Sequence, residues 1–177
     1  GEVSQVLLEL QQCTDRVRVS RARPELESAL HTTLDFAEIH PRFRDKITES
    51  DEVAAAKKLI AELIQEEEDA AAAAERLRLQ KEARERLRAA MLEATSTRDP
   101  EPLKAVIEDI VVTTAILPEE DEDVVAARAL VKQLEEEARL KAEAIALLQK
   151  AIQKVEQAED VVQMQAFADS DLLPQLK

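Results

Sequence analysis

The chain has 177 residues, 24 of them basic and 38 acidic, which gives a net charge of −14. Apolar residues make up 45% but include three Phe, no Trp and no Tyr, and the one Gly is Gly1. Each aromatic side chain would bury about 150–250 Å², so the core must be thin and built from Leu, Ile, Val and Ala. Without internal Gly, β-hairpins are disfavoured. The charge argues against nucleic acid and anionic lipid as partners, and the composition predicts an all-α fold.

Three helices are predicted in the first part of the chain. Val3, Val6, Leu10 and Val17 form the apolar stripe of the first helix. A proline at residue 24 opens a short second helix over residues 24–36, since proline fits the first helical turn, and a proline at residue 41 closes it. A third helix starts at Asp51 and meets no Pro, Gly or turn cluster before Thr95, so we expect it to reach on the order of 65 Å. The stripes of the second and third helices are Leu26, Ala29, Leu30 and Thr33, and Val53, Leu59, Ile60, Leu63 and Ile64.

The same order of elements then recurs. Residues 125–134 (VAARALVKQL) match residues 54–63 (AAAKKLIAEL), and Pro100 opens a second short helix over residues 100–112. The acidic run from 119 to 123 starts a long helix that we expect to end near Ala158. Helix capping explains these acids; a calcium loop is the alternative, but it lacks the Gly that an EF-hand loop needs. The matching stripes are Leu87, Met91 and Ala94; Leu103, Val106, Ile107 and Ile110; and Val124, Leu130, Val131 and Leu134.

The repeat predicts how the chain is organised. A third copy begins near Ala144 with the stripe Leu148, Ile152 and Val155, and its short helix is expected to close at Pro174. We therefore predict an elongated helical repeat, in which small three-helix clusters are joined by long continuous helices. Its parts are a first unit (1–65), a helical spacer (66–81), a second unit (82–135), a short spacer (136–143) and a truncated third unit (144–177). The ion pairs Glu135–Arg139 and Glu137–Lys141 are expected to support the short spacer.

The sequence contains no pattern typical of catalysis. It has no Gly-rich phosphate loop, no nucleophile on a sharp turn and no isolated carboxylate pair. His31, His40 and Cys13 lack the spacing of zinc ligands, and we expect His31 and Cys13 to be partly buried packing residues. We predict a segment that is not an enzyme and holds no cofactor or metal. No apolar run reaches membrane-spanning length and no signal-peptide pattern is present, which favours a cytoplasmic protein.

Two features could bind a partner. Arg16, Arg18, Arg21 and Arg23, here called the arginine corner, cluster between the first two helices. They could dock on an acidic surface such as the tails of a cytoskeletal polymer; solvated helix ends are the alternative. Phe43 lies in an apolar loop that either anchors a partner or covers the end of its own cluster.

The order of long and short helices resembles spectrin-type repeats, in which one helix crosses between units. The Ala/Glu-rich units, with the sequence RDPEPL at residues 98–103, also resemble segments of large cytoskeletal or flagellar scaffold proteins. This resemblance implies a rigid spacer and docking scaffold in a cytoskeletal or flagellar assembly, with coiled-coil contacts to other proteins or to a second copy. One alternative is an accessory helical segment of a motor or enzyme whose catalytic domain lies elsewhere. Another is a membrane-curvature module, against which the charge argues.

Overall fold

The computed structural model describes the backbone of residues 1–175 and the side chains of residues 1–168. Within these residues every regular element is a helix and no strand occurs, which confirms the all-α prediction. The chain divides into two compact units, Gly1–Arg78 and Leu79–Lys177. Each unit has its own hydrophobic cluster of aliphatic residues, as the shortage of aromatic residues led us to expect.

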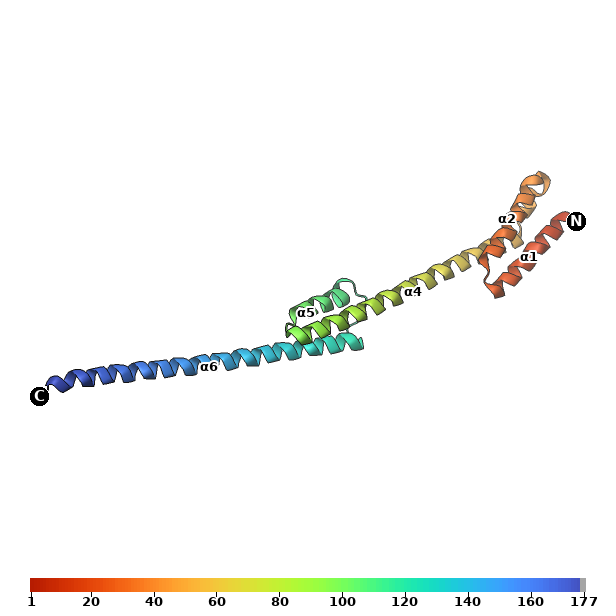
Figure 1. The fold of residues 1–177 in the computed structure, drawn as a ribbon. Helices are drawn as coiled ribbons and strands as arrows, with labels where there is room; N and C mark the ends of the chain where they lie inside the picture. The colour runs from red at the N-terminus through yellow and green to blue at the C-terminus, as the bar shows by residue number, and fades with distance from the viewer. Residues whose placement is uncertain (176–177) are drawn as a thin grey trace. The chain divides into compact units, whose positions relative to one another are not determined.

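The first unit packs α1 (Glu2–Ser20), α2 (Arg23–Ile39) and the start of α4 (Asp51–Thr97) around one core. Figure 1 shows α1 and α2 as an antiparallel pair. Between α2 and α4 lie a 3₁₀ turn, η1 (Pro41–Phe43), and the short helix α3 (Arg44–Thr48). Ile47 of α3 is fully buried and closes the end of the core. Most residues of the predicted stripes are buried: Val3, Leu10, Val17, Leu26, Leu30, Thr33, Val53, Leu59 and Leu63. The expected burial of Ile64 is wrong: its side chain is 37% exposed, because it follows the last contact of α4 with this core.

The second unit repeats this packing with the end of α4, α5 (Glu101–Glu108) and the start of α6 (Glu122–Gln175). In Figure 1, α5 lies beside the last turns of α4, and the first turns of α6 pack on the same part of α4. A π-helical turn, η2 (Asp109–Thr113), follows α5, so the short helix is regular over fewer residues than expected. Leu117 in the following loop is buried and covers the end of this core, as Ile47 does in the first unit.

The long helices begin where the acidic caps were predicted. The hydroxyl Oγ of Ser50 accepts a hydrogen bond from the backbone N–H of Val53 at 3.3 Å, and α4 runs unbroken to Thr97. A carboxylate oxygen of Asp121 accepts the backbone N–H of Asp123 at 3.0 Å. The predicted end of the second long helix near Ala158 is wrong, because α6 continues to Gln175. No short helix folds back within that range, and Pro174 lies in its last turn.

Two arginines end helices with a backbone conformation that usually calls for glycine. Arg21 has φ of 58° and Arg98 has φ of 60°. In each case the backbone N–H donates to the carbonyl four residues earlier, Val17 or Ala94, at 2.8 Å. This is the left-handed end of a helix, which satisfies a carbonyl that would otherwise lack a partner. Arg21 and Arg98 therefore occupy the same position in the two units.

Candidate docking surfaces

The side chains of the arginine corner are largely engaged within the first unit. Arg16 donates two hydrogen bonds to a carboxylate oxygen of Glu25, at 2.8 and 3.0 Å. Arg23 contacts Glu27 and also Glu67 of α4, with N–O distances of 2.5 and 2.9 Å. These partners raise the pKa of Arg23, chiefly through the hydrogen bond to Glu67. An external acidic partner would have to compete with these glutamates.

Arg21 of the arginine corner forms an ion pair with α4 that has a counterpart in the second unit. Its guanidinium lies 3.4 Å from a carboxylate oxygen of Glu66 on α4. In the second unit, Arg98 lies 3.2 Å from Glu137 on α6. Glu66 follows the buried Leu63 by three residues, and Glu137 follows the buried Leu134 by three. The same contact thus joins the end of α1 to α4 in the first unit and the end of α4 to α6 in the second. This repetition favours a structural role for Arg21.

Arg18 differs from the other three members of the corner. It is exposed and, among the described residues, has no ion-pair partner. Together with Arg21 and Lys58 it lines an open groove between α1 and α4. Glu62 also lines this groove and lies 4.0 Å from Lys58. Within the predicted docking site, Arg18 is therefore the cation most available to an acidic partner.

Phe43 packs against its own unit. Its side chain is half-buried and contacts the first core from the loop between α2 and α3. The guanidinium of Arg42 lies 5.8 Å from the centre of the Phe43 ring, within the range of a cation–π contact. Phe36 and His40 form a second ring pair nearby, with centroids 4.3 Å apart. This packing favours the interpretation in which the loop covers the end of its own cluster, although part of the ring stays accessible.

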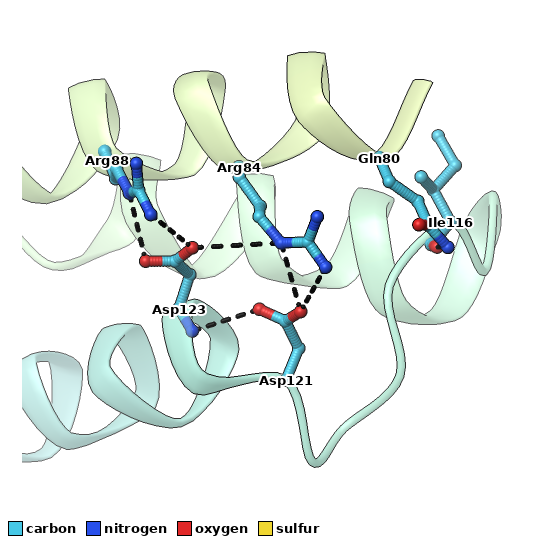
Figure 2. Close-up of polar contacts among 6 residues, drawn as sticks. All are labelled: Gln80, Arg84, Arg88, Ile116, Asp121 and Asp123. Carbon is cyan, nitrogen blue, oxygen red and sulfur yellow. Dashed lines mark hydrogen bonds and ion pairs between the residues drawn. The ribbon is translucent and has the colours of Figure 1, made fainter. Parts of the chain in front are cut away.

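A network of arginines and aspartates joins α4 to the start of α6, and the sequence did not predict it. Arg84 donates to Asp121, with N–O distances of 2.8 and 3.2 Å, and Arg88 donates to Asp123, with N–O distances of 3.0 and 3.1 Å. Figure 2 shows both pairs. Arg84 also lies 4.0 Å from Asp123, so the two pairs are linked. Gln80 contributes at 3.5 Å from the carbonyl of Ile116. Arg84 and Arg88 lie one helical turn apart, and the acidic run from 119 to 123 caps the next long helix. This combination is the sequence signal that could have predicted the network.

Asp121 is the most buried carboxylate of this network. The side chain of Asp121 is only 9% exposed. Burial by itself raises the pKa of Asp121, but hydrogen bonds from Arg84 and from the backbone N–H of Asp123 outweigh this effect, so the net pKa lies below its ordinary value. The pKa of Arg88 is raised, first by its hydrogen bond to Asp123. The acidic run therefore begins α6 and bonds to α4, and Glu119 in addition pairs with Arg128 at 2.7 Å.

The structure also tests the expected burial of Cys13 and His31 and the expected ion pairs of Glu135 and Glu137. Cys13 is buried, but the expected burial of His31 is wrong, because its side chain is 78% exposed and lies 3.2 Å from Asp35. The expected pairs within residues 135–141 are also replaced. Glu135 bonds to Lys104 of α5 at 2.8 Å, while Glu137 bonds to Arg98. These acids secure the second unit instead of supporting a separate spacer.

Within the described residues, no group of three or more His, Cys, Asp or Glu is placed to hold a metal ion. None of the helices over that part of the chain combines the length and the apolar character needed to cross a membrane. Comparison with protein-family models, with curated proteins and with solved structures finds no match to this chain.

Proposed function

We propose that this chain is a non-catalytic structural segment, acting as a helical spacer and a docking scaffold in a larger cytoskeletal or flagellar assembly. One observation carries the spacer role. The single helix α4 contributes to both hydrophobic clusters, yet every side chain from residue 64 to residue 78 is exposed. We call this stretch the α4 spacer. At its first turn it is held by Glu66 and Glu67, which pair with Arg21 and Arg23.

The α4 spacer also contains two pairs between residues of the helix itself. Gln65 donates to Asp69 at 2.9 Å, and Arg78 pairs with Glu75 at 2.6 Å. The hydrogen bond from Arg78 lowers the pKa of Glu75. Between these pairs lies a run of alanines, which have the highest helix propensity. A helix that persists without a core suits a spacer, because its stiffness does not depend on burial against a neighbour.

The docking role rests on the arginine corner, with Arg18 as its most accessible cation. The rest of the surface carries excess negative charge, since the whole chain has a net charge of −14. An acidic partner would be repelled from most orientations, so one local cation group would fix how the chain lies on it.

Spin-label distance measurement between the units tests the spacer role. Labels on cysteines replacing Thr32 of α2 and Glu108 of α5, both exposed, would be used in a Cys13→Ala background. A narrow distance distribution is expected, and the pair Ala72→Gly and Ala73→Gly should broaden it, because each Gly costs about 1 kcal/mol in a helix. The matched control, Ala72→Gln with Ala73→Gln, should leave it narrow. A broad distribution in the native chain would refute the spacer role.

A further inference from the structure

The part of α6 that follows the second hydrophobic cluster carries an apolar stripe that no other described residue covers. Every side chain from residue 135 to residue 168 is exposed. Within this stretch the large apolar residues Ile145, Leu148, Ile152 and Val155 are between 47% and 64% exposed. They follow one another at intervals of three, four and three residues, and Val162 continues the pattern one heptad later. We call these five residues the α6 stripe; alternating three- and four-residue spacing is typical of a two-helix coiled coil.

The α6 stripe continues an interface that already exists in the second unit. The same heptad spacing leads back along α6 to Leu134, Val131, Ala127 and Val124, all buried in the second cluster. Only Ala138 and Lys141 lie between the buried and exposed parts of the pattern. The exposed stripe therefore has the same heptad spacing as the buried part, which packs against a neighbouring helix.

The residue types along the exposed part of α6 also repeat those of a face of α4 that packs in the second hydrophobic cluster. On α4 this covered face consists of Ala83, Leu87, Ala90, Met91 and Ala94, and its counterpart on α6 is Ala144, Leu148, Ala151, Ile152 and Val155. Small residues at Ala144, Ala151 and Ala158, seven apart beside the stripe, would let a second helix approach closely. The pattern calls for a helical partner rather than an extended peptide.

We propose that the occupant is α6 of a second copy of this chain, packed antiparallel. Charge selects both the partner and its direction. Residues 141–154 contain Lys141, Lys150 and Lys154 against Glu143, a net of +2 (3 − 1). Residues 155–168 contain Glu156, Glu159 and Asp160, a net of −3 (0 − 3). A parallel in-register pair sets the basic half against the partner's basic half and Glu159 against Glu159, whereas an antiparallel pair centred on residue 150 places Lys141 opposite the partner's Glu159 at both ends.

Charge also explains why two copies would meet here and not elsewhere. Residues 141–168 carry a net charge of −1 (2 − 3), whereas the chain as a whole carries −14. The remaining surface of one copy therefore repels that of another. The α6 stripe lies in a nearly neutral stretch where apolar contact meets little electrostatic opposition.

The two charged residues in the heptad positions fix the register. Lys141 and Glu159 occupy positions that are otherwise apolar. When the antiparallel pair is centred on residue 150, Lys141 faces the partner's Glu159, and Leu148 faces the partner's Ile152. Ile145 then faces the partner's Val155, so every large apolar residue in this part of the stripe meets another. A shift of one heptad places Leu148 against the partner's Glu159, which buries a charge on an aliphatic side chain.

Sedimentation equilibrium of the full chain over a range of concentrations tests this pairing. The native chain is expected to pass from 19.8 kDa to twice that mass as concentration rises. Leu148→Gln should raise the dimer dissociation constant at least tenfold. The neighbouring Leu147→Gln is the matched control: Leu147 is equally exposed, at 67% against 62%, but lies outside the stripe. Both positions are away from the cores, so circular dichroism should show native helix content in both variants.

Charge exchange tests direction and register. Lys141→Glu should weaken the dimer, because it would face the partner's Glu159, and adding Glu159→Lys should restore it. A native chain that stays monomeric at every concentration, a dimer that Leu148→Gln leaves intact, or a failure of the double exchange to restore affinity would each overturn the proposal. The pairing does not depend on the spacer role, so a monomer with a narrow spin-label distance would overturn this inference alone.

Discussion

Removal of the Asp121 carboxylate should lower the free energy of unfolding of the second unit by about 2 kcal/mol. Asp121→Ala removes the cap at the start of α6, which is worth about 1 kcal/mol. It also removes the paired hydrogen bonds from Arg84, at 2.8 and 3.2 Å. A charged hydrogen bond contributes about 1.5–3 kcal/mol, but Arg84 is 37% exposed and can turn to water, so we expect about 1 kcal/mol from that contact.

Hydrogen exchange followed by mass spectrometry resolves the two units. Peptides from α5 and the start of α6 should exchange roughly 30-fold faster in Asp121→Ala, since 1.36 kcal/mol corresponds to a factor of ten. Peptides from α1 and α2 should be unchanged. The matched control is Asp109→Ala, which breaks an ion pair with Arg86 whose partners are 55% and 36% exposed. Such exposed pairs are worth about 0–1 kcal/mol, so equal effects from both substitutions would refute the argument from burial.

The effect of Asp121 should also depend on pH. Its folded-state pKa is lowered from the ordinary value, so the stabilisation is complete above the pKa of the unfolded chain and is lost as pH falls through the folded-state pKa. The difference in exchange between the native chain and Asp121→Ala should therefore be constant near neutral pH and shrink below about pH 4. A difference that grows on acidification would contradict this sign.

Two further predictions concern the cores and the arginine corner. Leu103→Ala should destabilise the second unit by about 2–5 kcal/mol in urea unfolding, because Leu103 is fully buried, whereas Ala73→Gln in the α4 spacer should cost under ~0.5 kcal/mol; equal losses would mean that the spacer is packed. Binding to microtubules, as an example of an acidic polymer, can be measured by co-sedimentation. Arg18→Gln alone should weaken this binding as much as a variant with Gln at all four arginines of the corner does, and it should leave thermal stability unchanged. Arg21→Gln should instead lower stability by breaking the contact with Glu66, and binding that survives Arg18→Gln would remove the corner from consideration.

Periodicity and proline position were sufficient to predict most of the fold. Stripes spaced for a helix identified buried residues such as Leu26, Leu87 and Leu134, because a thin aliphatic core leaves each helix only one face to bury. The starts of α4 and α6 followed from acidic and hydroxyl caps, whose chemistry is local. Both kinds of signal depend on neighbours within a few residues of one another.

Features that depend on contacts distant in sequence were missed. The left-handed turns at Arg21 and Arg98 could not be foreseen, since non-glycine residues adopt that conformation only where surrounding contacts offset the strain. The exposure of His31 and the partners of Glu135 and Glu137 depend on which helix face meets which neighbour. The end of α6 was misplaced because the repeat was extended to Pro174, although helix-forming residues continue without a break up to it.

The sharing of α4 between the two clusters has a consequence for how the chain folds. Starting an isolated helix is unfavourable by a factor of roughly 10³, or about 4 kcal/mol, while adding a residue to an existing helix is nearly neutral. Once one cluster has formed its part of α4, the α4 spacer can extend the helix into the other cluster without a second nucleation event. The two clusters share no core, yet each lowers the free-energy barrier to ordering the other. Glycine in the spacer should therefore separate their unfolding transitions while leaving both cores intact.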